Sequence, residues 1–219
     1  MTPKDIPAAI KILKQEYRKF KTPYVTEVAA KSRKDPFKAL ISCIISLRTK
    51  DETTRTASER LFAIASTPDE MSRLSPKTVE KAVYPAGFYR VKAKNIIGLS
   101  KAIVRDFAGK PPDTIEGLLT LKGVGRKTAN LVVTMGYGNP GICVDTHVHR
   151  ITNRWGFVGT RGPEETEFEL REKLPQRYWI IINDLLVAYG QNICKPVSPL
   201  CSGCRLYKLC ERRGVGASR

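Results

Sequence analysis

The sequence predicts an all-α fold, and three observations support this prediction. Capping residues followed directly by proline recur along the chain, as at Thr67-Pro68 and Ser75-Pro76, and this pair is typical of helix N-termini. Apolar residues recur every three or four positions, which is the period of an amphipathic helix. We find no alternating segment that would suit a strand, and no internal repeat beyond helix–turn–helix units.

The N-terminal half contains several expected helices. Thr2-Pro3-Lys4-Asp5 is a helix start, and the residues that follow carry apolar side chains on one face. Asp35-Pro36 opens another helix, in which residues 37–47 are so apolar that we expect burial on almost every side. The polar segment 46–51 comes next, and its composition alone fits a solvated loop equally well. A turn at 87–90 then precedes a helix that continues to Phe107.

The C-terminal half begins after a cluster of glycine and proline at 136–141, where we expect the chain to pass between two lobes. Asp145 is placed to cap a helix that runs to about Trp155. Pro163 starts an acidic helix, and residues 178–190 form a further helix with an apolar stripe.

The turn Gly123-Val124-Gly125 is the centre of the sequence, because it joins one helix to the start of the next. The free amides at a helix N-terminus suit a phosphate, although such a turn is more often only a packing corner. Arg126 and Lys127 follow at once. A lysine in the first turn of a helix faces the positive end of the dipole, which favours the neutral, nucleophilic amine.

Composition points to a polyanionic partner. The 219 residues include 38 Lys and Arg against 21 Asp and Glu, which gives a net charge of +17. Such an excess is most often found in nucleic-acid-binding proteins, although a ribosomal or membrane-surface protein would share it. We find neither a signal-peptide pattern nor an apolar stretch of membrane-spanning length, so we expect an intracellular protein.

Four of the six cysteines lie close together. Cys194, Cys201, Cys204 and Cys210 have the spacing C-x6-C-x2-C-x5-C. Four thiolates this close can bind one centre, either Zn²⁺ or an iron–sulfur cluster. The spacing favours a [4Fe–4S] cluster over zinc or free thiols, because zinc ribbons usually set two CxxC knuckles further apart. The other two, Cys43 and Cys143, fall in apolar surroundings that suit packing.

Residues 121–130, the segment Val144-Asp145-Thr146-His147 and the cysteine spacing together resemble the endonuclease III family of helix-hairpin-helix DNA glycosylases. The resemblance covers nearly the whole chain to Cys210. It implies a two-lobed fold, with a six-helix lobe at 29–136 that holds the hairpin. The cluster lobe would combine 1–28 with 137–211, the DNA cleft would lie between the lobes, and 212–219 would be a flexible tail.

The resemblance also implies an activity. The family removes oxidised pyrimidines from DNA as a bifunctional glycosylase and DNA-(apurinic or apyrimidinic site) lyase of base excision repair. It implies that a flipped base exposes its sugar to attack by Lys127, that Asp145 assists, and that β-elimination follows. Aspartate before a helix is more often only a cap, but the two matches together favour catalysis. The four clustered cysteines would hold a [4Fe–4S] cluster that is mainly structural.

The expected partner is double-stranded DNA that contains a damaged pyrimidine or an abasic site. Arg48, where the family commonly has glutamine, would line the DNA cleft, and Phe88 would be a wedge in the base stack, although an aromatic in a basic turn is more often packing. His147 and His149 are a poor metal pair. The further candidate DNA contacts are Lys122, where the family usually has proline, and Gly123, Gly125, Arg126, His147 and Arg150.

Two other functions remain open from the sequence. An adenine-mismatch glycosylase would use a glutamate from the early buried helix, but residues 39–50 contain no such carboxylate before Asp51. A catalytically silent DNA-binding module would use the hairpin and the cluster only to contact phosphate. We expect a cytoplasmic monomer, nucleoid-associated if prokaryotic, that does not bind membranes.

Overall fold

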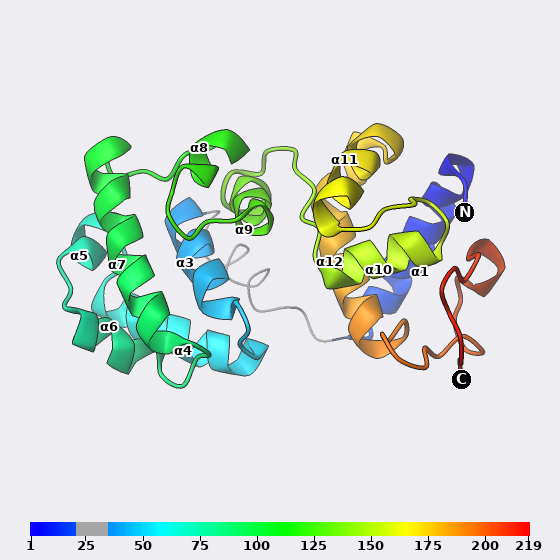
Figure 1. Ribbon diagram of the computed structural model, residues 1–219, viewed down its shortest axis with the longest axis horizontal. Coiled ribbons are helices and arrows are strands. Elements are labelled where there is room, and N and C mark those ends of the chain that lie inside the picture. The colour runs from blue at the N-terminus through cyan, green and yellow to red at the C-terminus, as the bar shows by residue number, and fades with distance from the viewer. Residues whose placement is uncertain (21–34) are drawn as a thin grey trace. The chain divides into compact units, whose positions relative to one another are not determined.

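The computed structural model describes residues 1–20 and 35–219, and the described part of the chain contains helices and connecting loops but no strand (Figure 1). This confirms the all-α prediction. Contacts divide the chain into two compact units. The hairpin unit is Pro23–Gly141, and the terminal unit combines Met1–Thr22 with Ile142–Arg219. The boundary expected between residues 28 and 29 lies outside the described residues, and the later boundary falls at 141/142 where 136/137 was expected.

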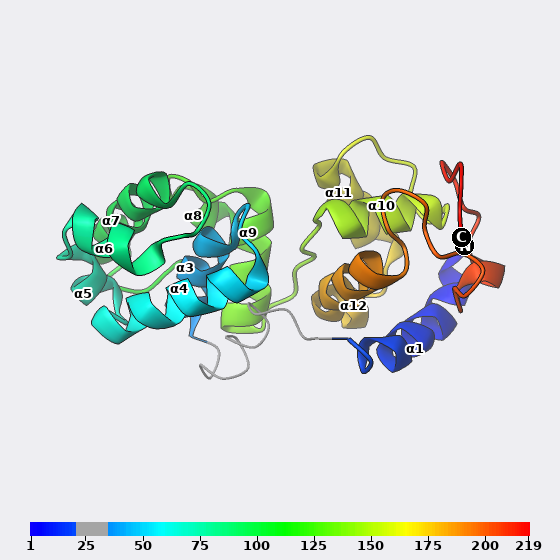
Figure 2. The ribbon, with the colours of Figure 1, turned by 90° about the horizontal axis from the view of Figure 1, so that it is seen from below.

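The hairpin unit is built around one buried helix, α3 (Pro36–Ser46). Its apolar residues point in every direction, and Leu40, Ile41 and Ile45 have no exposed surface. It packs against α4, α7, α9 and the π-helical segment Val132–Tyr137 that continues α9, and Figure 2 shows α4 beside it. The other α-helices in the described part of this unit are α4 (Asp51–Ile64), α5 (Pro68–Ser72), α6 (Pro76–Val83), α7 (Tyr89–Asp106), α8 (Ile115–Leu119) and α9 (Arg126–Leu131).

Local capping explains where several of these helices begin. The Asp35 carboxylate accepts hydrogen bonds from the amides of Phe37 (2.9 Å) and Lys38 (3.1 Å), which would otherwise have no helical partner. Thr67 and Glu70 form a reciprocal capping box at α5. The start signals read from the sequence are therefore confirmed at these helices.

Helix α4 was not anticipated from the sequence. Its segment is rich in threonine and charge, and its buried side chains are small: Thr54, Ala57 and Ser58, with Leu61 as the large one. Threonine has a modest helix propensity, and a small-residue stripe gives a weak apolar signal. The helix forms because this face packs against α3 and α6.

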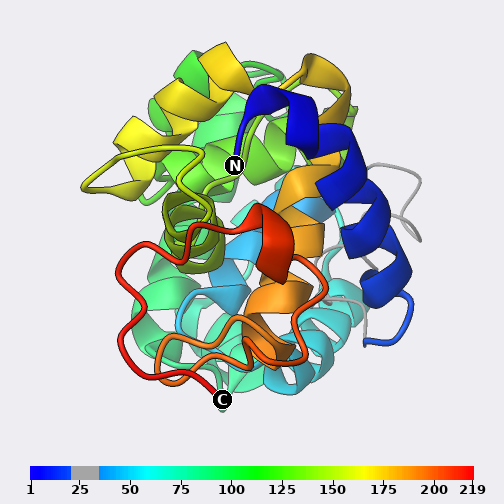
Figure 3. The same cartoon turned by 90° about the vertical axis from the view of Figure 1, so that its right-hand side faces the viewer.

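The terminal unit joins the two ends of the chain. Its helices are α1 (Ile6–Tyr17), α10 (Thr146–Arg154), α11 (Pro163–Lys173) and α12 (Trp179–Asn192). Short 3₁₀ turns lie at Pro3–Asp5, Gln176–Tyr178 and Tyr207–Leu209. Helices α1 and α12 lie side by side in Figure 3, and the core of this unit buries Ile10 and Leu13 of α1 with Ile151 and Leu186.

The tail 212–219, expected to be flexible, makes backbone hydrogen bonds instead. The Arg213 amide donates to the Arg154 carbonyl (3.1 Å) and the Arg219 amide to the Pro199 carbonyl (2.8 Å). These bonds hold the tail against α10 and the cysteine loop. Among the described helices, none has the length and hydropathy needed to cross a membrane.

Candidate functional site

The hairpin turn connects α8 to α9, and the structure gives a different account of each of its two glycines. Gly123 has φ +87°, a conformation that disfavours any residue with a Cβ, and a Cβ there would lie 3.2 Å from Asn95 Nδ2. Gly125 is the N-cap of α9 and has extended backbone. A Cβ at Gly125 would meet no atom of the described residues within 4 Å. Backbone conformation and the neighbouring Asn95 therefore explain why position 123 is glycine, but no contact within the described residues explains Gly125.

Lys127 lies in the first turn of α9, and its side chain is exposed. Helix α9 packs on α3, where Cys43 is buried. Burial raises the pKa of the Cys43 thiol to about 12, and the charge of Lys127 acts in the opposite direction. The Lys127 charge is therefore close enough to act on Cys43 of α3, while the Lys127 residue stays exposed. Its neighbour Arg126 is half-buried, and Lys122 in the turn is exposed.

Two loops of the hairpin unit bring Arg48 and Phe88 together. The α3–α4 loop (residues 47–50) carries Arg48, and the α6–α7 turn (residues 84–88) carries Phe88. Both residues have left-handed backbone, with φ 52° and 56°. The Arg48 guanidinium carbon lies 5.6 Å from the centre of the Phe88 ring, and Phe88 is 62% exposed. The structure thus pairs two residues that the sequence analysis selected separately.

Lys92, on α7, was missed by the sequence analysis. It is buried against the end of α3 and the α3–α4 loop, and burial lowers its pKa to about 8. Three oxygen acceptors surround the amine and favour its charged form. A sequence signal existed, because Lys92 stands four residues before Ile96 on the face that α7 buries, where a lysine is unexpected.

Asp145 is the N-cap of α10, as the sequence predicted. Its Oδ1 accepts hydrogen bonds from the amides of His147 (2.8 Å) and Val148 (2.9 Å). One carboxylate oxygen thus caps the N-terminus of α10. Asp145 belongs to the terminal unit and Lys127 to the hairpin unit.

Arg150 makes its contacts within the terminal unit. Its guanidinium donates to the carbonyls of Cys194 (2.9 Å) and Gly190 (3.2 Å), and it lies 3.0 Å from His147 Nδ1. Gly190 lies in the last turn of α12, and Cys194 lies two residues beyond the end of that helix. Arg150 therefore ties α10 to α12, whereas the sequence analysis had proposed it as a phosphate contact. His147 is half-buried beside it.

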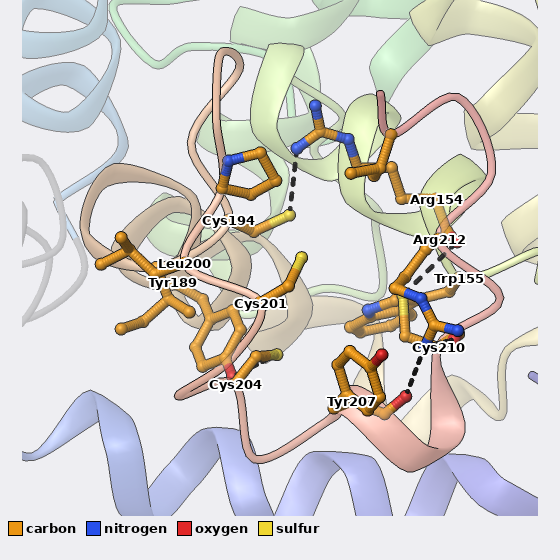
Figure 4. A pocket seen from close by; sticks show the side chains of 13 residues that line it. Arg154, Trp155, Tyr189, Cys194, Leu200, Cys201, Cys204, Tyr207, Cys210 and Arg212 are labelled. Atoms are coloured by element: carbon orange, nitrogen blue, oxygen red, sulfur yellow. Dashed lines mark hydrogen bonds between the residues drawn. The ribbon is translucent and has the colours of Figure 1, made fainter. Parts of the chain in front are cut away.

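The four clustered cysteines line one pocket of the terminal unit (Figure 4). All of the chain's cysteines are free of disulfides, and these four are partly exposed, whereas Cys43 and Cys143 are buried. Polar groups surround the sulfurs. Arg154 donates from Nη1 to Cys194 Sγ (3.4 Å), and the Tyr189 hydroxyl lies 3.2 Å from Cys204 Sγ.

The chemistry of this pocket suits an iron–sulfur cluster. Burial raises the pKa values of the Cys204 and Cys210 thiols, so a cationic centre is needed to hold them as thiolates. A [4Fe–4S] cluster spreads its cysteines over four irons, and hydrogen bonds to the sulfurs tune it. Arg205, within the cysteine loop, pairs with Glu16 at 3.0 Å.

Comparison with known proteins identifies relatives across most of the chain. Residues 41–176 match the family model of the HhH-GPD superfamily base excision DNA repair protein. The chain is 47% identical over 188 residues to Endonuclease III of Thermotoga maritima, covering 84% of this chain and 88% of that protein. It is 35% identical over 178 residues to Endonuclease III of Bacillus subtilis, covering 81% of each. The solved structure of a trapped endonuclease III–DNA covalent intermediate matches with a TM-score of 0.84 and 30% identity, over 97% of both chains.

Proposed function

The chain belongs to the endonuclease III family of the HhH-GPD superfamily, and from this membership we propose that Lys127 and Asp145 are its catalytic residues. The protein is a DNA glycosylase and AP lyase of base excision repair. Its DNA substrate follows from the same relationship, because its structural neighbours are endonuclease III–DNA complexes. The observation that carries the residue assignment is the exposed amine of Lys127 at the start of α9, directly after the hairpin turn.

Lys127 is the proposed nucleophile. Its nitrogen forms a bond to C1′ of the damaged nucleotide as the bond from C1′ to the base breaks, and the base leaves with the bonding electrons and gains a proton. Opening of the sugar ring gives a Schiff base between the lysine and C1′. Loss of a proton from C2′ then breaks the C3′–O bond, and the strand is cut 3′ to the lesion. The base must leave the stack before the amine can reach C1′.

Asp145 is proposed to assist this reaction while it caps α10. Its Oδ1 is engaged with two backbone amides. A carboxylate facing the sugar stabilises the positive charge that develops there as the base departs, and it can accept or return a proton. Capping and catalysis are compatible, because a carboxylate has several acceptor positions.

DNA contacts are proposed at the hairpin and at the paired loops. The open space at Gly125 allows the backbone to approach a phosphate closely, and this approach would account for a glycine at this position. Lys122, Gly123 and Arg126 would contact the same strand. Arg48 and Phe88 would enter the duplex, and His147 would lie close to the DNA. The proposed lesions are oxidised pyrimidines. The protein is proposed to act as a monomer, in the compartment that contains the DNA.

The cofactor proposed for the cysteine pocket is a [4Fe–4S] cluster. Cys194, Cys201, Cys204 and Cys210 would each bind one iron. When bound, the cluster supplies rigid cross-links that organise the C-terminal loop. Arg154 and Tyr189 would stabilise the anionic sulfurs through the hydrogen bonds described above.

Borohydride trapping tests the nucleophile. A Schiff base reduced by borohydride leaves the protein covalently attached to abasic DNA. We expect an adduct with the unmutated protein and none with Lys127→Gln, which should still bind DNA. Lys101→Gln is the matched control, because Lys101 is an exposed lysine on α7 of the same unit, and it should trap normally.

Two outcomes would contradict the proposal. Base release by Lys127→Gln at the unmutated rate would show that another group attacks C1′. Absence of an adduct with the unmutated protein would favour the catalytically silent DNA-binding module instead.

A further inference from the structure

Lys92, in the first turn of α7, binds the end of α3 and the α3–α4 loop, which are distant from it in the sequence. Its side chain is 5% exposed, and its ammonium donates to the carbonyls of Ile45 (2.6 Å) and Leu47 (2.7 Å) and to Thr49 Oγ1 (2.8 Å). An ammonium has three N–H donors, so all three are used. Two of the acceptors are carbonyls at the end of α3, where the helix itself offers no partner and the dipole favours a cation.

Thr49 extends this link to the α6–α7 turn. Its hydroxyl oxygen accepts hydrogen bonds from Lys92 and from the Gly87 amide (3.1 Å), and it donates to the Leu47 carbonyl (3.2 Å). The single donor and both acceptor positions of this hydroxyl are therefore occupied. The Thr49 side chain therefore joins the α3–α4 loop to the Gly87 amide of the α6–α7 turn and to Lys92 of α7.

The two loops also touch through their backbones. A Cβ at Gly87 would lie 2.5 Å from the Arg48 carbonyl oxygen, so this approach requires glycine. Phe88 follows Gly87 directly. Arg48 and Phe88 both have left-handed backbone, and the Arg48 guanidinium lies over the Phe88 ring. Left-handed backbone in a residue with a Cβ persists only where its surroundings hold it. The contacts of Lys92 and Thr49 supply that restraint on both loops.

We propose that Lys92 is a positioning residue that holds the α3–α4 loop and the α6–α7 turn together, so that Arg48 and Phe88 enter the DNA duplex as one unit. This inference rests on the proposed function, because it assigns Lys92 to the step in which the base leaves the stack. Unstacking a base step costs free energy, which the contacts of the inserted side chains offset. Two independent loops would lose part of this gain, because they would first have to be ordered. Lys92 does not touch the reacting atoms. Its effect is confined to duplex substrates.

The test compares two substrates under single turnover. Base excision from duplex DNA needs the wedge, whereas β-elimination at an abasic site in single-stranded DNA needs only Lys127 and its surroundings. For Lys92→Met we expect duplex excision to fall by about 10- to 100-fold, the scale of a small misplacement of reacting groups. Cleavage and borohydride trapping on single-stranded abasic DNA should stay close to those of the unmutated protein. Lys101→Met is the control, and both activities should be unchanged.

A second variant keeps the test valid if Lys92→Met does not fold. Thr49→Val removes only the hydroxyl that joins the two loops, and we expect the same selective loss on duplex DNA. A 2-aminopurine base opposite the lesion should also lose its fluorescence response to binding in both variants, because that base is no longer unstacked by the wedge. Lys92→Arg, which keeps the charge and several donors, should restore part of the duplex activity.

The outcomes separate this inference from the assignment of function. Equal loss on both substrates, or no loss on either, would refute the positioning role and leave the glycosylase and lyase assignment intact. Absence of trapping by the unmutated protein would instead refute the nucleophile on which the inference rests.

Discussion

Replacing Asp145 separates its two proposed roles. Its Oδ1 accepts two amide hydrogen bonds at the start of α10, and the same carboxylate is the proposed catalytic partner of Lys127. Asp145→Asn keeps a side-chain oxygen of similar reach but removes the charge. Asp145→Ala removes both the oxygen and the charge. If the two roles are real, the two variants should agree in activity and differ in stability.

The size of each effect follows from the structure. Loss of an aspartate cap costs about 1 kcal/mol, and asparagine caps nearly as well as aspartate. For a chain of this length, 1 kcal/mol lowers the melting temperature by about 2–4 °C. We therefore expect Asp145→Ala to melt lower by this amount and Asp145→Asn to melt close to the unmutated protein. Both should lose about 10²- to 10⁴-fold in single-turnover base excision, the usual contribution of a positioned acid or base.

Thermal melting and single-turnover excision on the same preparations provide the assay. Ser75→Ala is a matched control, because Ser75 Oγ caps α6 by accepting the Thr78 amide at 3.1 Å and has no proposed catalytic role. That control should lose stability but keep excision. Excision by Asp145→Asn at the unmutated rate would show that the carboxylate is only a cap. Equal destabilisation by Asn and Ala would contradict the capping argument.

Three further predictions concern the cofactor, the packing of the terminal unit and pH. Cys204→Ser should lower the iron content and the visible absorbance of the purified protein, as measured by metal analysis and spectroscopy; full retention of iron would exclude Cys204 as a ligand. Gly190→Ala should lower the free energy of unfolding in urea by about 1–3 kcal/mol, because the added Cβ would lie 2.4 Å from His147 Nδ1; Gly98→Ala, in open space on α7, is its control. Burial lowers the pKa of Lys92 from 10.5 to about 8. Between pH 8 and pH 10.5 the unfolded chain therefore binds more protons at Lys92 than the folded chain does, and the contribution of Lys92 to the free energy of unfolding rises with pH. The advantage of the unmutated protein over Lys92→Met in urea titrations should therefore increase by up to about 3 kcal/mol from pH 8 to 10.5, and a decrease would contradict the sign.

Local signals explain which parts of the fold could be predicted. Asp35-Pro36 and Thr67-Pro68 mark helix starts through contacts within a few residues, so they could be read directly from the sequence. Helix α4 could not, because its buried face of small residues becomes meaningful only against α3 and α6. Its stability comes from tertiary packing, which leaves little trace in a single segment.

The candidate site shows the same division. Lys127, Asp145 and the cysteines stand in recognisable motifs, whereas Lys92 acts through carbonyls and a hydroxyl more than forty residues away in sequence. Arg150 shows the converse case, and its DNA contact stays a prediction. Its charge suggested phosphate, but its guanidinium is directed at carbonyls of the α12 end. Sequence gives the type of a side chain, and only the fold decides which acceptors it reaches.

The division of the terminal unit between both ends of the chain has a consequence for biosynthesis. The hairpin unit is one continuous segment, so its core can form as soon as residue 141 has left the ribosome. Helix α1 is made before the hairpin unit, yet its apolar face must wait for α12, which is translated after that unit. We expect the nascent chain to keep this face exposed throughout elongation, and premature termination should yield a folded hairpin unit with an unpartnered, chaperone-binding α1.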